Sequence, residues 1–278
     1  MKRDPRHILL VSYDDPHDPT SWSGVPHAVL RALERQVERI DVLTRVPLVH
    51  RPLHTAAHHL LGRHRYPRWL TEPALRGLGR ALERTAAELR PDAIISVSSQ
   101  YLVRCSPDLF DRIPTVMFSD CPWELWQDAY RDYLVRCLHV RRYGRDEAAV
   151  ARRIATTVYA SDWATDWFVA RHGVPRDKLR AVPFGATLTP DAAPAPRVAS
   201  RGPLRLLFVG VDWRRKGGGF AVEVTRALRA LGRDAQLDVV GCTPELPPAD
   251  TAFVRRPGVL ALDVPERRAR LADLYGEA

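Results

Sequence analysis

The sequence predicts an α/β protein made of two Rossmann-like domains, and three observations lead to this expectation. Short apolar, β-branched stretches alternate with helical patterns through the long N-terminal part of the chain, as in a doubly wound parallel sheet. The run TPDAAPAPRVASRGP then interrupts the pattern, because its prolines disfavour a regular element. A new strand–helix–strand pattern starts at Leu204. We therefore place the first domain at residues 1–186, a linker at 187–203 and the second domain at 204–278.

The first domain begins with a strand and a helix. The stretch His7 to Ser12 is dominated by aliphatic residues, which predicts a buried strand. A polar loop leads to a helix from about Pro26 to Gln36, and proline suits the first turn because its missing amide has no helical partner there. The helix turns Val29, Leu30 and Leu33 inward. A second strand is expected from Ile40 to Val46.

The remainder of the first domain keeps alternating helices and strands. One helical stretch carries leucines at helical spacing, namely Leu75, Leu78, Leu82 and Leu89. Four further strands are expected in DAIISVSS, TVMFSD, TTVYAS and KLRAVPFG. Because ligands of such sheets bind beyond the carboxyl ends of the strands, we expect the loops after the first strands of both domains to border a shared cleft.

The second domain opens with the sequence LRLLFVGVDWRRKGGGFAVEV. Leu204 to Val209 has the length and apolar density of a buried strand, and Leu237 to Val240 predicts the next one. The helix between them is expected to bury one apolar face, made of Phe220, Val224, Ala227, Leu228 and Leu231. This strand–helix–strand unit predicts a right-handed crossover in a parallel sheet.

Three cations and three glycines stand where the strand turns into the helix. The first amides of a helix have no partner within it and point along the positive end of its dipole, so anions bind there. Gly217, Gly218 and Gly219 let a phosphate approach the backbone, and Arg214, Arg215 and Lys216 supply charge. The alternative is a solvated basic loop, because the spacing matches neither a Walker loop nor a dinucleotide fingerprint. Lysine is otherwise present only at Lys2 and Lys178, which suggests that a compact charge is wanted at 216.

The composition restricts the partners. The 278 residues include 42 Lys plus Arg against 33 Asp plus Glu, for a formal net charge of +9 and a pI near 9.8. We expect attraction to polyanions such as nucleic acid, anionic lipid or phosphorylated ligands, but no specific nucleic-acid module accompanies the arginines. No apolar run approaches the ~20 residues of a membrane span, and the polar N-terminus does not look like a signal peptide, so we expect a cytoplasmic protein. The scattered Cys105, Cys121, Cys137 and Cys242 predict neither disulfides nor a metal site.

Three stretches carry a resemblance to a known family: SWSGVPHAVLRAL, VYASDWATDWFVARHGVPRDKLRAVPFGA and LLFVGVDWRRKGG. They resemble the retaining, nucleotide-sugar-dependent glycosyltransferases of the GT-B fold, particularly bacterial family 4 (glycosyl transferases group 1). The resemblance implies transfer of a hexose from a nucleoside-diphosphate sugar to a hydroxyl of a glycan or lipid-linked acceptor, with no metal and no cofactor. Weak contact with an anionic inner membrane face is compatible with it. The remaining hypothesis from another class is a basic, non-catalytic binding protein for nucleic acid or an anionic membrane surface, supported by the net charge and by RHRYPRWL.

The resemblance also assigns donor-binding residues. Gly24 matches the glycine at the start of the first helix that lets the backbone approach the donor diphosphate, its alternative being an ordinary helix-entry glycine. Lys216, with Gly217 after it, matches the family's lysine that neutralises the leaving diphosphate. Val211 stands where the family has an arginine, so the second cation is expected from Arg215 or Arg214.

Other positions have open alternatives. Asp120 matches the place where the family presents a polar residue to the transferred sugar, and it could instead cap the helix that starts in PWELW. Ser161, ahead of Asp162, is expected to cap a helix. Trp163 and Trp167 are expected in core or hinge packing, and their alternative is contact with a ligand. His17 and His27 near the first loop are weak acceptor-side candidates.

The family continues beyond the point where this sequence ends at LADLYGEA, into an acidic motif that binds the nucleoside and the donor sugar. The resemblance therefore implies that the second domain is incomplete. We expect that this chain alone is not a full transferase.

Overall fold

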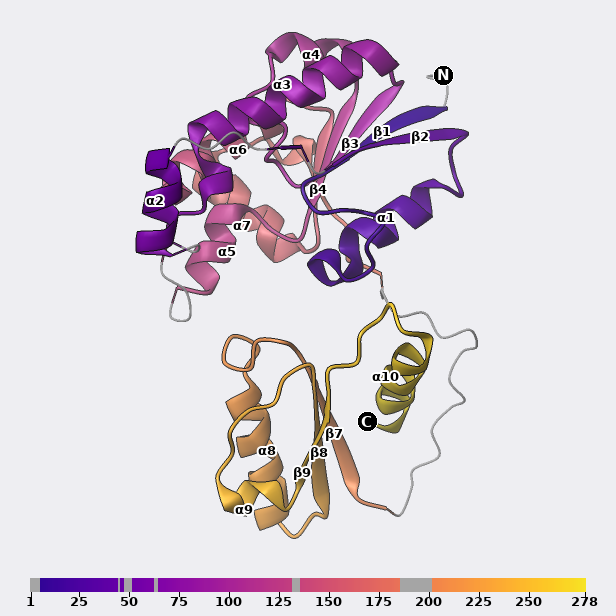
Figure 1. Cartoon of the computed structure of the whole chain (residues 1–278), viewed down its shortest axis with the longest axis vertical. Coiled ribbons are helices and arrows are strands. Elements are labelled where there is room, and N and C mark those ends of the chain that lie inside the picture. The colour runs from indigo at the N-terminus through magenta and orange to yellow at the C-terminus, as the bar shows by residue number, and fades with distance from the viewer. Residues whose placement is uncertain (1–5, 45, 48–51, 63–64, 132–135, 186–201) are drawn as a thin grey trace. The chain divides into compact units, whose positions relative to one another are not determined.

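The computed structural model describes residues 6–278 apart from 45, 48–51, 63–64, 132–135 and 186–201. The chain divides into two compact units, Met1–Gly185 (unit 1) and Ala186–Ala278 (unit 2), which Figure 1 shows in indigo to pink and in orange to yellow. Nearly all of the predicted linker 187–203 lies outside the described residues.

The described residues of unit 1 form a six-stranded sheet in which every neighbouring pair is parallel. Its order is β2-β1-β3-β4-β5-β6. The strands are β1 (His7–Ser12), β2 (Arg39–Leu43), β3 (Ala93–Val97), β4 (Thr115–Ser119), β5 (Thr156–Tyr159) and β6 (Leu179–Ala181). The helices are α1 (Val25–Leu33), α2 (Pro52–Leu61), α3 (Glu72–Leu89), α4 (Pro107–Arg112), α5 (Trp123–Ala129), α6 (Val140–Arg153) and α7 (Asp162–His172).

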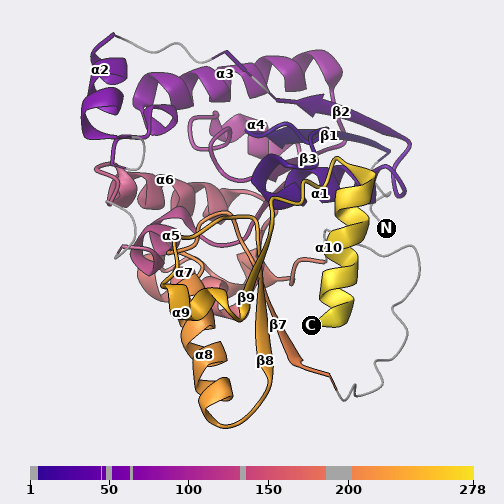
Figure 2. The same cartoon turned by 60° about the horizontal axis from the view of Figure 1, so that its bottom comes forward.

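Helices cover both faces of this sheet, because its strands are apolar on both sides. Leu9 and Val11 of β1 belong to the large core that includes the leucines of α3, whereas Leu10 packs with Leu30 of α1. Figures 1 and 2 show α3 and α1 on opposite sides of the strands. The predicted α/β fold with parallel sheets is therefore confirmed, although β2 and α1 end earlier than predicted, at Leu43 and Leu33.

Ion pairs hold the helices of unit 1 together. The Arg104 guanidinium donates to Glu72 at the start of α3 and to Asp146 of α6, at 2.9 and 2.7 Å. Hydrogen bonds from Arg104 are the main reason why the pKa of Glu72 falls to about 2. The buried Glu124 of α5 accepts from Arg171 of α7 at 2.7 Å. These contacts link α3 to α6 through Arg104, and α5 to α7 directly.

Unit 2 has a smaller sheet with the parallel order β7-β8-β9 in the part that the structure describes. Its elements are β7 (Leu204–Val209), α8 (Gly218–Ala230), β8 (Ala235–Val240), α9 (Pro248–Thr251), β9 (Val254–Gly258) and α10 (Pro265–Glu277). One face of the sheet packs on Val222 of α8, and the other packs on Leu271 and Leu274 of α10. Figure 1 shows the two helices on opposite sides of the strands.

The predicted buried face of α8 is wrong for Phe220, Ala227 and Leu231, whereas Val224 and Leu228 are half-buried. Phe220 is 71% exposed and Leu231 is 78% exposed, and Ala227 is exposed too. The residues of α8 that are buried are Gly218, Val222 and Thr225. On this buried side the start of the helix approaches Trp213 so closely that only a glycine fits at 218.

Candidate functional site

The basic turn, which we define as residues 210–217, joins the end of β7 to the start of α8. Gly217 is the N-cap residue of α8 and lies in the left-handed region, with φ of +77°. No side chain caps this helix. The amides of Gly219 and Phe220 in the first turn therefore have no helical acceptor and face the place where an anion can bind.

Each glycine of the triplet has a different role. Gly217 adopts a backbone conformation that other residues reach only with strain. A Cβ on Gly218 would lie 2.1 Å from the Trp213 ring, so only glycine fits there. A Cβ on Gly219 would meet nothing within 4 Å, and its backbone is not left-handed. Gly219 therefore has no structural requirement that the described residues explain, and it leaves the first turn of α8 open.

Lys216 is exposed beside this helix start. Its aliphatic stem passes over Gly210, where a Cβ would lie 3.1 Å from Lys216 Cγ. The Lys216 amide donates to the Asp212 carbonyl at 3.0 Å, which fixes the backbone, while the ammonium forms no ion pair with any described residue. A fixed backbone with an uncommitted ammonium suits a residue that neutralises an anionic ligand.

The arginines of the basic turn differ from each other. Arg215 donates to the Asp212 carboxylate through its amide at 3.0 Å and through Nε at 3.3 Å, and it is only partly exposed. Arg214 is exposed. The structure thus brings the four predicted donor-binding residues of the second domain into one turn, with Lys216 and Arg214 outermost.

In unit 1, the chain leaves the carboxyl end of β1 toward β2 on one side, while β3 lies on the other side of β1. Such a reversal of strand order marks the place where α/β sheets bind ligands. Ser12 closes β1 and pairs in register with Val97 at the end of β3. Its buried Oγ has no hydrogen-bond partner among the described residues, which marks a polar group available at this point of the sheet.

Gly24 lies at the start of α1 and is the last of three successive residues with positive φ. The angles are +41° at Trp22, +56° at Ser23 and +82° at Gly24. Non-glycine residues hold such conformations at a cost of order 1 kcal/mol each, and strained backbone of this kind clusters at binding sites. Gly24 is buried and no side chain caps α1. The geometry is compatible with close approach of a ligand to this backbone, and donor contact by Gly24 stays a prediction.

Asp120 follows β4, two strands away from β1 in the sheet. Its Oδ1 accepts from the Cys121 amide at 2.8 Å, and burial raises the pKa of its carboxyl. The alternative role as a helix cap is wrong, because α5 has Pro122 as its N-cap residue and no side-chain cap. Asp120 instead stabilises its own loop at the carboxyl end of the sheet, where its role toward a sugar or acceptor stays a prediction.

Sequence reasoning missed Glu147, which lies on α6 beneath the loops after β3 and β4. Ser99 Oγ donates to Glu147 Oε1 at 2.9 Å, and the Trp123 amide donates to Oε2 at 3.2 Å. Glu147 is 2% exposed and pairs with no described cation. Burial raises its pKa to about 7, although both hydrogen bonds oppose the shift. The sequence RDEAAVARR carried no signal of this, because it looks like a solvated helix face.

The loop after β3 is also strained. Ser98 has φ of +76°, and this conformation is held by its amide, which donates to the Phe118 carbonyl at 2.8 Å. Ser96 Oγ donates to the Ser98 carbonyl at 2.7 Å. The strained Ser98 therefore stands between Ser12 and Asp120 in the order of the strands, at the same edge of the sheet.

The remaining residues singled out from the sequence mainly cap helices or pack within unit 1. Ser161 caps α7 by accepting from the Ala164 amide at 3.2 Å. Trp167 packs against the core, but Trp163 is exposed, so core packing is wrong for Trp163 and its packing at a hinge stays a prediction. His27 Nδ1 lies 3.1 Å from the Pro16 carbonyl and ties α1 to the first loop.

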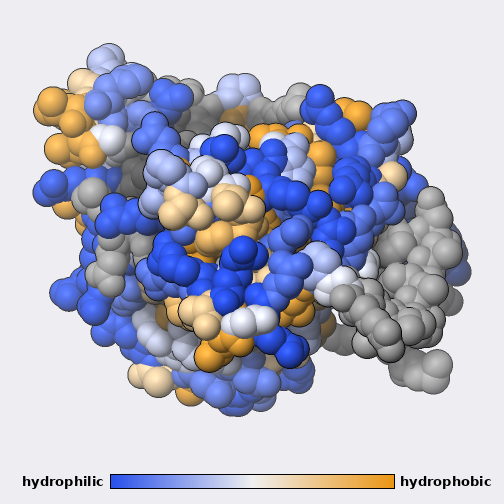
Figure 3. Space-filling model, turned by 90° about the horizontal axis from the view of Figure 1, so that it is seen from below, coloured by the Kyte–Doolittle hydropathy of each residue, from blue (hydrophilic) through white to orange (hydrophobic). Residues whose placement is uncertain are grey.

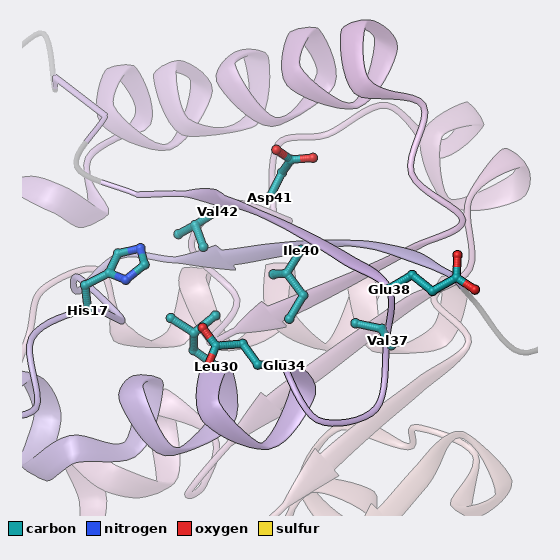
Figure 4. A pocket seen from close by; sticks show the side chains of 8 residues that line it. All are labelled: His17, Leu30, Glu34, Val37, Glu38, Ile40, Asp41 and Val42. Carbon is teal, nitrogen blue, oxygen red and sulfur yellow. The ribbon is translucent and has the colours of Figure 1, made fainter.

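A pocket of about 340 Å³ lies between α1 and the edge strand β2. Figure 4 shows its lining: His17, Leu30, Glu34, Val37, Glu38, Ile40, Asp41 and Val42. It contains His17 but none of the residues predicted to bind the donor or to carry catalysis. In the part of the chain that the structure describes, no group of three or more His, Cys, Asp or Glu could hold a metal ion.

The chain resembles known proteins in its three-dimensional structure. No protein-family model and no curated protein matches the sequence. Among solved structures, sucrose-phosphate synthase from Thermosynechococcus elongatus is similar with a TM-score of 0.59 at 16% identity, over 98% of this chain and 74% of that one. The lipopolysaccharide outer core galactosyltransferase WaaB is similar with a TM-score of 0.56 at 11% identity, over 92% and 69%. WaaG, a glycosyltransferase involved in lipopolysaccharide biosynthesis, gives 0.51 at 14%, over 96% and 72%. The chain therefore has the α/β fold of GT-B glycosyltransferases.

Proposed function

We propose that the protein is a glycosyltransferase that moves a hexose from a nucleoside-diphosphate sugar to a hydroxyl of a glycan or lipid-linked acceptor, with retention of configuration. Its fold supports this function, since the similar structures include glycosyltransferases. Two of them belong to lipopolysaccharide biosynthesis by their titles, which favours a polysaccharide or lipid-linked acceptor. We place the reaction in the cytoplasm, without a metal ion or cofactor.

The observation that carries the proposal is the basic turn. An exposed lysine with no ion-pair partner among the described residues stands next to a helix start that no side chain caps. Departure of a nucleoside diphosphate develops negative charge on the phosphate oxygens, and fixed cations and amides stabilise that charge in the transition state. Lys216 supplies the charge, and the amides of Gly219 and Phe220 supply hydrogen bonds. The second cation comes from Arg214 or Arg215, which lie in the same turn; Arg214 is the more exposed of the two.

Unit 1 contributes the acceptor side in this proposal. Asp120 contacts a hydroxyl of the transferred sugar or of the acceptor, and Gly24 lets the α1 backbone approach the diphosphate. Ser12 Oγ is a further candidate for a polar contact, because it is buried without a partner among the described residues. The alternative of a basic, non-catalytic binding protein is not favoured, because it does not account for the glycosyltransferase-like fold.

Binding of the leaving group tests the proposal most directly. Calorimetric titration with UDP, GDP and ADP should give saturable binding of at least one of them. Lys216→Ala should weaken that binding by about tenfold or more, the usual value of a charge-assisted contact. Arg233→Ala is the matched control, because it removes an exposed cation at the other end of α8. No saturable binding, or equal loss in both variants, would overturn the proposal.

A second variant separates nucleoside-diphosphate binding from turnover of the donor sugar. Asp120→Asn should leave nucleoside-diphosphate affinity unchanged and lower donor turnover, measured as diphosphate release from the donor sugar whose nucleotide binds. Unchanged turnover in Asp120→Asn would remove Asp120 from the mechanism while leaving the role of Lys216 intact.

A further inference from the structure

Asp212 is the one carboxylate in the basic turn, whose sequence is GVDWRRKG. It comes directly before the cations Arg214, Arg215 and Lys216, separated from them by one tryptophan. A carboxylate at this point repels a diphosphate, because both carry negative charge. Its side chain is 45% exposed and lies in the same turn as the cations that are proposed to bind the leaving group. A turn that binds an anion therefore gains from Asp212 only if this residue has another role.

Asp212 contacts the last two cationic residues of the turn. The Arg215 amide donates to Asp212 Oδ1 at 3.0 Å, and Arg215 Nε donates to Oδ2 at 3.3 Å. The Lys216 amide donates to the Asp212 carbonyl at 3.0 Å. The Arg215 side chain is only 20% exposed, whereas Arg214, which receives no such contact from Asp212 in its printed geometry, is exposed. Asp212 thus fixes the backbone of Arg215 and Lys216 and holds one guanidinium close to the turn.

The backbone of this turn is itself closely packed. The Trp213 ring meets the Phe208 ring edge-on, with 5.1 Å between the ring centroids, and it lies so close to Gly218 that a Cβ there would be 2.1 Å away. A Cβ on Gly241, after β8, would lie 2.9 Å from the Gly210 carbonyl oxygen. Because the turn is packed at both of its ends, a cation that is held to it keeps a defined position.

We propose that Asp212 is a positioning residue for the diphosphate of the donor, and that it holds Arg215 and Lys216 where phosphate oxygens bind. This inference rests on the proposed function and deepens it. A mobile arginine loses side-chain entropy when it binds a ligand, whereas an arginine that is already held loses less. The guanidinium has five donors in a rigid fork, so one contact through Nε orients the whole group. This gain exceeds the repulsion between Asp212 and the phosphate charge.

The expected sign of the effect separates this role from two simpler ones. If Asp212 only repels the ligand, removal of its charge strengthens anion binding. If Asp212 only stabilises the fold, its removal lowers the melting temperature and leaves the affinity of the folded chain unchanged. If Asp212 positions the cations, its removal weakens binding although the site becomes more positive.

Calorimetric titration of the full chain with inorganic pyrophosphate, at fixed ionic strength, tests the proposal without the nucleoside or the sugar. Asp212→Ala should weaken binding about fivefold or more, because it removes both side-chain contacts to Arg215. Asp212→Asn should fall between wild type and Asp212→Ala, since an amide oxygen can still accept from the Arg215 amide. Asp212→Asn also keeps the test valid if Asp212→Ala folds poorly.

The matched control is Asp234→Ala, which removes the same charge beyond the other end of α8. Asp234 is exposed and lies 3.5 Å from Arg229, so this variant should bind pyrophosphate like wild type. Figure 3 views the molecule from below, the side toward which this end of α8 points in Figure 1, and shows a mostly hydrophilic face there.

The Arg215→Ala background gives a second test. Without a guanidinium to hold, the Asp212 carboxylate only repels the ligand, so adding Asp212→Ala should no longer weaken binding. The double variant should bind pyrophosphate at least as tightly as Arg215→Ala alone. A purely structural role would give the same loss in both backgrounds.

Unchanged or tighter binding by Asp212→Ala and Asp212→Asn would overturn the proposal, and so would an equal loss in both backgrounds. Absence of pyrophosphate binding by wild type would overturn it as well. Pyrophosphate binding with the expected losses, but no saturable binding of any nucleoside diphosphate, would instead overturn the proposed function and leave Asp212 as a positioning residue for a diphosphate.

Discussion

Glu147 is buried without a counter-ion, in contrast to Glu124 of the same unit. Glu124 has Arg171 at 2.7 Å, whereas Glu147 has only the Ser99 hydroxyl and the Trp123 amide. A buried carboxylate in such surroundings favours its neutral form, because the charged form loses more solvation than two hydrogen bonds return. The loops after β3 and β4, which carry Ser98 and Asp120, are therefore hydrogen-bonded to a carboxyl group whose pKa lies near neutral pH.

We predict that Glu147 makes the protein less stable as the pH rises from about 4.5 to about 7. The pKa is about 7 in the folded chain, against an ordinary value of 4.5, so the folded state binds more protons over this range. Stability must then fall with rising pH. Glu147→Gln should remove this fall, and its free energy of unfolding should exceed that of wild type by roughly 1–3 kcal/mol at pH 8.

Chemical denaturation at several pH values measures this difference. Glu88→Gln is the control, because Glu88 is exposed on α3 and its loss should leave the pH dependence as in wild type. Parallel curves for wild type and Glu147→Gln would show that Glu147 is not the titrating group.

Neighbouring glycines of the basic turn should respond differently to the same substitution. Gly218→Ala places a methyl group against the Trp213 ring and should cost about 1–3 kcal/mol of unfolding free energy. Gly219→Ala meets open space in the first turn of a helix and should change stability by less than about 0.5 kcal/mol. Thermal melts distinguish the two, and equal destabilisation would mean that Trp213 does not constrain the turn.

Helix α8 packs on the sheet with a different face from the one that its apolar pattern predicts. Phe220 to Leu231 has helical periodicity, yet the packed side carries Gly218, Val222 and Thr225. Thr225 tolerates burial because its Oγ1 donates to the Ala221 carbonyl of the same helix at 2.8 Å. Gly218 lies against Trp213 on the packed side, while Phe220 and Leu231 are exposed.

This rotation predicts which apolar residue of α8 stabilises unit 2. Val222→Ala should cost roughly 1–3 kcal/mol, because Val222 is buried against the sheet. Phe220→Ala should cost less than about 0.5 kcal/mol despite the larger side chain, because Phe220 is mostly exposed. Denaturant midpoints of the two variants provide the measurement. A larger loss of unfolding free energy in Phe220→Ala than in Val222→Ala would mean that the face predicted from the sequence is the packed one.

The whole chain consists of two units with separate cores, and we predict that they unfold separately. Unit 1 has its own six-stranded sheet and large core, and unit 2 has two smaller core clusters. The smaller unit buries a lower fraction of its surface and should melt first. In scanning calorimetry, Gly218→Ala should lower only the first transition and Glu147→Gln should move only the second. A single transition shifted by both variants would contradict this prediction.

The sequence by itself determined the order of the elements, the parallel sheets and the position of the basic turn. These depend on local patterns, since strand periodicity, helix entry and left-handed turns are encoded by residues close together in the chain. Gly24 was singled out through the family resemblance and Gly217 as part of the glycine triplet at the helix entry, and the structure gives both a positive φ.

Only the tertiary structure decided what the same residues face. The sequence around Glu147 looks like a solvated helix face, but the Ser99 hydroxyl and the Trp123 amide, from the loops after β3 and β4, bind its carboxylate in the folded chain. The physical reason is that burial depends on which distant segments pack against an element. A periodic pattern specifies that a helix has two faces, and the contacts of the folded chain select the one that is covered.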